Sequence, residues 1–317
     1  MRRWLLALGM AVGVAVTTAP TAAQGPAGAQ DQPTFRAGID VVSVGATVRD
    51  RKGRLVPGLT VGDFQVLDGG QPRAISGFHT ESVPVSLAIL FDISGSMDVG
   101  DRTTAAKFAA HHVLSWLEPG RDEAALFAFD SRLHEVAPFT VDTRALQGAL
   151  GEVDPFGATS LHDAIAAAAQ RVSERLGRRR AVVVLTDGID TASRLSPADV
   201  SGIASAIDVP VYIIATVMPI DDRSSTNRDD RSTVATGSVE DLANWTGGAC
   251  FYATTPSESS RVSRQVLDEL RNQYLIAFEP ATGSGWRPLE IRTRQKDYTV
   301  RTRSGYMAGG SRSTTGW

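Results

Sequence analysis

The stretch Val85-Ser-Leu-Ala-Ile-Leu-Phe-Asp-Ile-Ser-Gly-Ser96 decides the fold prediction. Its run 86–91 is almost wholly apolar, which is typical of a strand buried on both faces of a parallel sheet. Three polar side chains follow at alternate positions, where this strand ends: Asp92, Ser94 and Ser96. In open α/β sheets, ligands bind outside the carboxyl ends of the strands. This turn is therefore the first candidate for a functional site.

Around this strand, apolar runs alternate with amphipathic segments. Further strands are predicted at 124–129, 181–185, 209–217 and 250–253, with an edge strand at 133–139. Helices are predicted at 103–117, 143–152 and 160–176, from about 196, at 239–245 and at 257–272. Apolar strands alternating with helices predict an α/β fold, in which a doubly wound, mostly parallel sheet is covered on both faces.

The segments on either side of this α/β region are β-rich. Strands are predicted at 39–48, 64–70 and 75–79 before it, and at 273–278, 287–293 and 298–303 after it. These antiparallel flanks either pair into one small β-sandwich or form two separate β additions, and both arrangements fit the sequence. The predicted division is a β-module at 33–82, an α/β domain at 83–271, a β segment at 272–307 and a flexible tail at 308–317.

The first residues have the pattern of an export signal. Arg2 and Arg3 precede an apolar run at 4–16, and small residues follow it. Residues 1–29 are therefore predicted to be a signal peptide, cleaved after Ala23 or Ala29. The apolar run is shorter than the roughly 20 residues that a spanning helix needs. We expect an exported product, periplasmic or secreted, with no stable membrane insertion after cleavage.

Composition narrows the classes of function. The 317 residues are 42% hydrophobic, which is enough for a folded core, and the formal net charge is −3. This charge argues against a nucleic-acid partner, because such binding depends on a basic face. The single cysteine, Cys250, excludes an intramolecular disulfide framework and any multi-cysteine metal site.

Two later segments add oxygen ligands to those of the first turn. Thr159 lies in a Gly-Ala-Thr-Ser segment, and Asp187 follows the predicted strand 181–185. Carboxylates, hydroxyls and water suit a hard divalent cation, so Mg²⁺ is expected, with Mn²⁺ or Ca²⁺ as alternatives. Of the neighbouring residues, Ser160 is expected to cap the helix that follows it, and His162 to lie at an exposed helix position.

The sequence resembles the von Willebrand factor type A (VWA) domain family. The resemblance covers about 85–271 and rests on five positions in the family's order, which match its metal-ion-dependent adhesion site: Asp92, Ser94, Ser96, Thr159 and Asp187. The flanks resemble those of bacterial exported VWFA-related proteins, with Arg-Asn-Gln-Tyr at 271–274 and Arg-Ser-Gly-Tyr at 303–306.

The resemblance implies how these residues act. Ser94, Ser96 and Thr159 are expected to contact the metal directly, while Asp92 and Asp187 bind it or hold its waters. One coordination position stays open and receives an Asp or Glu carboxylate from a protein partner. This is binding chemistry, which needs neither a nucleophile nor a general base.

Three functions follow as hypotheses. The first is an exported, non-enzymatic protein that binds an acidic side chain of a partner through a divalent cation. The second is a metal-dependent phosphoester hydrolase; against it, no second acid stands two residues after Asp92 and no lysine is near. The third is a scaffold whose metal is purely structural. The role of the polar insertion at 219–233 stays open.

Overall fold

A computed structural model gives the structure of the chain and describes residues 41–98, 102–151, 157–206, 208–216 and 239–309. The predicted signal peptide, the insertion at 219–233 and most of the predicted tail lie outside the described residues. Within the described part of the chain, no helix is long and apolar enough to cross a membrane.

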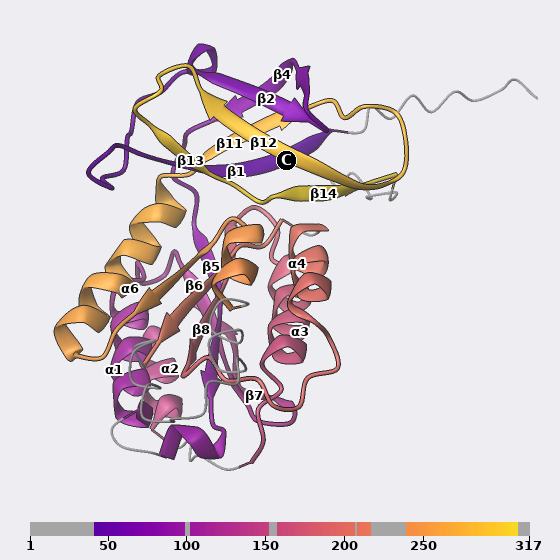
Figure 1. Cartoon of the computed structure of the whole chain (residues 1–317). Helices are drawn as coiled ribbons and strands as arrows, with labels where there is room; N and C mark the ends of the chain where they lie inside the picture. Colours follow the sequence, from indigo (N-terminus) through magenta and orange to yellow (C-terminus); the bar gives the residue numbers. More distant parts are fainter. Residues whose placement is uncertain (1–40, 99–101, 152–156, 207, 217–238, 310–317) are drawn as a thin grey trace, which may run out of the picture. The chain divides into compact units, whose positions relative to one another are not determined.

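A six-stranded sheet forms the centre of the α/β region, in the order β10-β9-β8-β5-β6-β7 (Figure 1). Its strands are β5 (Val85–Asp92), β6 (Glu123–Phe129), β7 (Leu133–Thr140), β8 (Arg179–Thr186), β9 (Val211–Ala215) and β10 (Ala249–Tyr252). All neighbours pair parallel except β6 and β7, which pair antiparallel at the edge. The predicted doubly wound sheet and its edge strand are confirmed.

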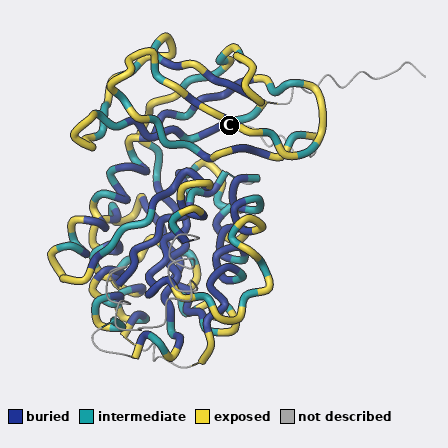
Figure 2. The backbone as a smooth tube through the Cα atoms, in the orientation of Figure 1, coloured by how far each residue is buried: buried dark blue, intermediate teal, exposed yellow. Residues whose placement is uncertain are grey.

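Helices cover both faces of this sheet. One face packs against α1 (Arg102–Ser115), α2 (Thr143–Leu150) and α6 (Pro256–Arg271). The other face packs against α3 (Leu161–Ser173), α4 (Pro197–Ala206) and a helical stretch at 239–245. Alternate residues of β5 enter the two cores, so all eight of its residues are buried, as Figure 2 shows for the central strands. This burial explains why its sequence is a continuous apolar run.

The flanking segments form a single β-sandwich. Its strands are β1 (Val42–Arg49), β2 (Phe64–Asp68), β3 (Gln71–Arg73), β4 (Ile75–His79), β11 (Tyr274–Phe278), β12 (Gly285–Thr293), β13 (Thr299–Arg301) and β14 (Gly305–Ala308). They make two four-stranded sheets, β13-β1-β11-β4 and β14-β12-β2-β3. Each sheet combines strands from both flanks, and one apolar core joins the sheets. Of the two arrangements that the sequence allowed, the structure has the paired one.

Two strands of the sandwich, β3 and β14, were not predicted, and β12 begins at Gly285, two residues before the predicted strand 287–293. Each is held by pairing: β3 with β2, and β14 with the start of β12. A strand of three or four residues carries too little periodicity to be recognised without its partner.

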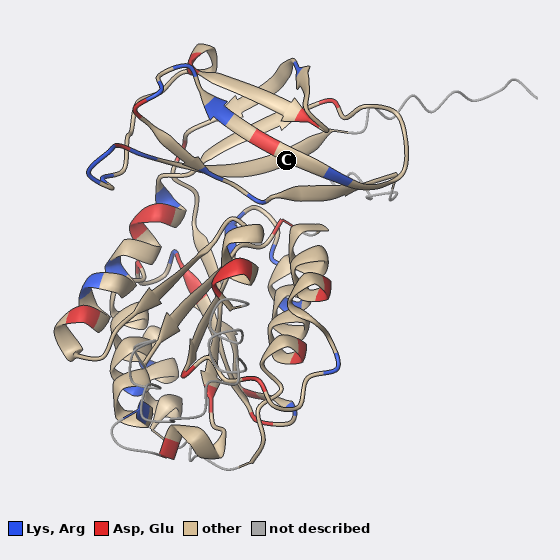
Figure 3. Cartoon of the chain, viewed as in Figure 1, with Lys and Arg blue, Asp and Glu red and all other residues tan. Residues whose placement is uncertain are grey.

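Polar contacts join the sandwich to the α/β region. The buried carboxylate of Glu269 on α6 accepts from Arg49 of β1 and Arg301 of β13. Arg303 donates to the backbone carbonyls of Ser205 and Ser43, the latter at 2.8 Å. Acidic and basic residues are mixed along α6 (Figure 3). All described residues belong to one compact unit that begins at Ile39.

Candidate metal centre

The candidate centre lies at the carboxyl edge of the central sheet, where β5 runs into the short 3₁₀ helix η2 (Gly95–Asp98). The backbone of this turn is fixed from two sides. The N–H of Ile93 donates to the carbonyl of Phe129 on β6 at 3.0 Å, and the N–H of Gly95 donates to the carbonyl of Gly157 at 2.9 Å. The second bond ties the Asp-x-Ser-x-Ser turn to the segment that carries Thr159.

The first three predicted ligands are in mutual contact. The buried carboxylate of Asp92 accepts the Ser94 N–H at 2.9 Å through Oδ1 and the Thr186 hydroxyl at 2.5 Å through Oδ2. The Oγ atoms of Ser94 and Ser96 are 3.0 Å apart. Ser94 is buried and Ser96 is half-buried. One carboxylate and two hydroxyl oxygens therefore converge within the turn.

Thr159 and Asp187 lie on neighbouring loops. Thr159 is buried, and its carbonyl accepts the N–H groups of Thr191 and Ala192, each at 2.9 Å. Asp187 accepts the Ile189 N–H at 3.2 Å through Oδ1. Among the described residues, no hydrogen bond joins the side chains of Thr159 or Asp187 to those of the first three ligands. The backbone brings all five predicted ligands to the carboxyl edge of the sheet. Asp92, Ser94 and Ser96 lie in one turn, and Thr159 and Asp187 lie on the neighbouring loops.

The pKa of Asp92 is raised to about 6, mainly by burial and to a smaller extent by the nearby carboxylate of Asp187. Hydrogen bonds from Ser94 and Thr186 act in the opposite direction. Two acids in a dry site without a compensating cation disfavour ionisation of the more buried one. A bound divalent cation would favour the ionised form of both.

The chemistry of the candidate ligand atoms indicates which metals could bind at this centre. The set consists of two carboxylates and three hydroxyls, all hard oxygen ligands. In the part of the chain that the structure describes, no group of three or more His, Cys, Asp or Glu residues is placed to hold a metal. The five residues therefore fit Mg²⁺, Mn²⁺ or Ca²⁺ better than a metal that prefers sulfur or imidazole ligands.

Arg102 is a residue of this edge that the sequence did not indicate. Its Nη1 lies 3.2 Å from Oδ2 of Asp187 and donates at 3.2 Å to the carbonyl of Ser96. It places a positive charge on one of the candidate ligands. No local motif marks it, because its partner stands 85 positions away in the sequence.

The prediction that His162 is exposed is wrong, and Ser160 takes the predicted N-cap position of α3 without a capping bond from its side chain. Instead, Oδ1 of Asp190 accepts the Leu161 N–H at 2.8 Å, and Ser193 Oγ accepts the N–H of His162 at 3.0 Å. His162 is buried, with Nδ1 3.6 Å from Oδ2 of Asp190. The loop after β8 therefore caps α3 and covers the imidazole, which local sequence does not reveal.

Residues 87–189 match the family model of the von Willebrand factor type A domain. A search of the curated proteins finds no match.

Similar solved structures share 11–20% identity with this chain. An aerotolerance-related membrane protein from Bacteroides fragilis is 20% identical over 59% of this chain and 98% of that chain (TM-score 0.48). A von Willebrand factor type A protein from Catenulispora acidiphila is 14% identical over 87% and 76% (TM-score 0.49). Proximal thread matrix protein 1 from the mussel byssus, with a zinc-occupied MIDAS motif, is 17% identical over 63% and 50% (TM-score 0.47).

The matched family and the observed fold agree. The region 87–189 begins in β5, ends after β8 and includes all five candidate ligands. The central sheet, its helices on both faces and the turn after β5 are those that the sequence pattern predicted. Residues 87–189 of this chain are therefore a von Willebrand factor type A domain.

Proposed function

We propose that this protein is an exported binding protein that holds an acidic side chain of a protein partner through a divalent cation. The observation that carries the proposal is the convergence of Asp92, Ser94 and Ser96 at the carboxyl edge of the sheet, with Asp187 close enough to perturb Asp92. Export rests on the predicted signal peptide at 1–29.

Each ligand has a role in this proposal. The hydroxyls of Ser94, Ser96 and Thr159 bind the cation, and Asp92 and Asp187 bind it or hold its waters. The cation, Mg²⁺ in our proposal, would supply a Lewis-acidic position that accepts an Asp or Glu carboxylate. Only two formal negative charges come from the protein, so a bound dication is at most neutralised, and its open coordination position still attracts an incoming carboxylate.

The proposal does not require catalysis. One observation favours the alternative, a phosphoester hydrolase: Arg102 supplies a cation beside the candidate ligands, which the sequence had not shown. The test is hydrolysis of p-nitrophenyl phosphate in the presence of Mg²⁺. If the wild type hydrolyses it and Asp92→Ala does not, hydrolysis would replace binding as the function. We expect no turnover above that of the variant.

Calorimetry tests the metal. Mg²⁺, Mn²⁺ and Ca²⁺ are titrated into chelator-treated mature protein, its Asp187→Ala variant and a control, Asp241→Ala, at an exposed helical position. We expect binding to the wild type and the control, and loss of binding to Asp187→Ala with circular dichroism unchanged. Equal binding by Asp187→Ala would remove Asp187 from the ligand set. Loss of the fold in Asp92→Ala would favour a purely structural metal.

An array of short peptides tests the ligand chemistry. Each peptide carries one Asp or Glu, and its matched control carries Asn or Gln at the same position. We expect metal-dependent retention of acidic peptides only, abolished by EDTA. Retention of both members of each pair, or retention in EDTA, would contradict a role for the carboxylate.

A further inference from the structure

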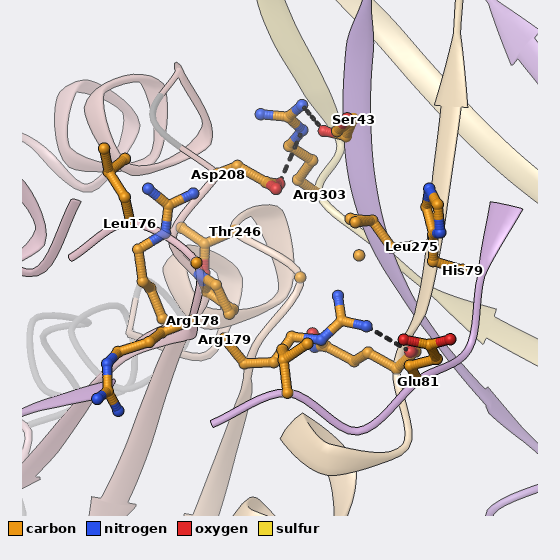
Figure 4. Close-up of a pocket in the computed structure, with 17 residues that line it drawn as sticks. Ser43, His79, Glu81, Leu176, Arg178, Arg179, Asp208, Thr246, Leu275 and Arg303 are labelled. Atoms are coloured by element: carbon orange, nitrogen blue, oxygen red, sulfur yellow. Dashed lines mark hydrogen bonds and ion pairs between the residues drawn. The ribbon is translucent and has the colours of Figure 1, made fainter. Parts of the chain in front are cut away.

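A second cavity lies far from the candidate metal centre along the strands. It has a volume of about 450 Å³ and is lined by the sandwich and by the α/β region (Figure 4). Its α/β lining includes Arg179 at the start of β8 and Pro210 just before β9, at the amino-terminal ends of parallel strands. Asp92 is the last residue of β5 and Asp187 directly follows β8, so the metal centre lies at the carboxyl edge of the sheet and the cavity at the opposite edge.

Arg179 is a buried cation in the wall of this cavity. It is 8% exposed, and its Nη2 donates to the carbonyl of Gln273 at 3.1 Å. Its Nε has no hydrogen-bond acceptor, and among the described residues no carboxylate lies within ion-pair distance of its guanidinium. Burial lowers the pKa of Arg179, and the charge of Asp208 only partly opposes this. A buried guanidinium without a counter-charge is costly, so buried charges are normally paired.

The other charges of the lining leave the cavity positive. Four arginines line it (Arg178, Arg179, Arg180 and Arg303), against two carboxylates, Glu81 and Asp208; of the arginines, Arg178 is paired outside the cavity, with Nε 3.6 Å from Oε1 of Glu123. Asp208 is engaged by Arg303, with Oδ1 3.5 Å from Nε. Glu81 is exposed, and Figure 4 shows it at the side of the cavity where Arg179 lies. This excess of positive charge favours an anion as the partner of the Arg179 guanidinium.

Size and lining indicate the kind of anion. A volume of about 450 Å³ lies in the range of small-molecule sites. Apolar side chains, including Leu176 and Leu275, share the wall with the arginines. The planar guanidinium matches the oxygen geometry of carboxylates and phosphates.

We propose that this cavity binds a small organic anion through Arg179, with its carboxylate or phosphate group beside the guanidinium and its carbon skeleton against the apolar wall. The site is independent of the metal centre. It would link the sandwich to the VWA domain, since its walls come from both.

The test measures binding of succinate and of inorganic phosphate by calorimetry and thermal shift, in EDTA so that the metal centre contributes nothing. The proteins are the mature wild type, Arg179→Met, Glu81→Gln and a control, Arg144→Met, which removes one positive charge at an exposed position of α2. The two probes distinguish a carboxylate site from a phosphate site.

We expect at least one probe to bind the wild type and raise its Tm. Arg179→Met should weaken binding about tenfold or more, because a charge-assisted hydrogen bond is lost. Glu81→Gln should strengthen it, and Arg144→Met should leave it unchanged. Without the anion, Arg179→Met should be at least as stable as the wild type, because an uncompensated buried charge is gone. Failure of both probes to bind, or unchanged binding by Arg179→Met, would overturn the proposal.

Discussion

Arg102 places a positive charge directly beside Asp187, one of the candidate metal ligands. Its guanidinium contacts Asp187, so a metal that uses Asp187 must compete with it or displace it. The arginine side chain is 27% exposed and the Asp187 side chain is buried, so solvent screens this pair only in part. We expect Arg102→Gln to tighten Mg²⁺ or Mn²⁺ binding a few-fold by calorimetry. Weaker binding would instead mean that Arg102 orients Asp187 for the metal; Arg144→Gln is the control for charge removal.

Asp122 provides a pH-dependent contribution to stability. Burial alone would raise its pKa, but hydrogen bonds from the N–H groups of Glu118 and Val85 and from Arg271 lower it below the ordinary value. Because the folded pKa is lower, the stabilisation is present above about pH 4, the unfolded value, and is lost as the pH falls through the folded value.

Replacement of this carboxylate should show the effect. We expect Asp122→Asn to be less stable than the wild type at pH 7 and to lose less stability between about pH 4 and pH 2. Urea unfolding across this range measures both. Asp241→Asn, at an exposed site, should follow the wild-type pH profile; a parallel profile for Asp122→Asn would contradict the assignment.

At the scale of elements, the segment before Thr159 depends on Gly157. Its φ is +112°, and a Cβ at this position would lie 3.2 Å from Cβ and Oδ2 of Asp130. Its carbonyl also accepts the N–H of Gly95, which fixes the two ligand segments to each other. We expect Gly157→Ala to destabilise the protein by about 1–3 kcal/mol and to weaken metal binding, because Thr159 shifts relative to Ser94 and Ser96.

Gly120 is the matched control. Its φ is +74°, but a Cβ there meets nothing within 4 Å. Gly120→Ala should therefore show the cost of backbone strain without the contact at Asp130, and metal binding should not change. Thermal unfolding and calorimetry compare the two variants. Equal effects on metal affinity would mean that Gly157 does not position the ligand segments.

The elements that the sequence predicted well are those that carry their own signal. β5 and β8 are continuous apolar runs because both of their faces are buried. The ends of helices were predicted less accurately. The helix predicted to end at 176, α3, ends at Ser173, because nothing in the local sequence marks its last turn. The Asp-x-Ser-x-Ser turn could be recognised from spacing, whereas the contact of Arg102 with Asp187 depends on tertiary structure.

At the scale of the whole molecule, the pairing of the two flanks could not be decided from sequence. Their alternating patterns predict strands but not partners, and β1 pairs with β11 across more than 200 residues. The polar contacts that tie the sandwich to the α/β region were equally hidden. In the sequence, nothing distinguishes the arginines and the glutamate that make these contacts from the other charged residues of the same strands and helices.

Glu269 is the central contact of this connection, and its replacement tests how strongly the two parts depend on each other. The carboxylate is fully buried, and its two oxygens accept from Arg49 and Arg301. Glu269→Gln leaves both guanidiniums without a counter-charge, and breaking a buried pair in this way costs about 3–5 kcal/mol. Because the arginine side chains are 20% and 23% exposed, we expect the lower end of this range.

Urea unfolding followed by circular dichroism measures the loss, with Glu290→Gln as the control. Glu290 is exposed and pairs with Arg292 on its own strand, so its replacement should change stability by less than about 1 kcal/mol. If Glu269 couples the sandwich to the α/β region, Glu269→Gln should also separate a single unfolding transition into two, because the contact that makes the two parts unfold together is weakened. A stability change no larger than that of Glu290→Gln would show that the remaining contacts, including those of Arg303, suffice to hold the parts together.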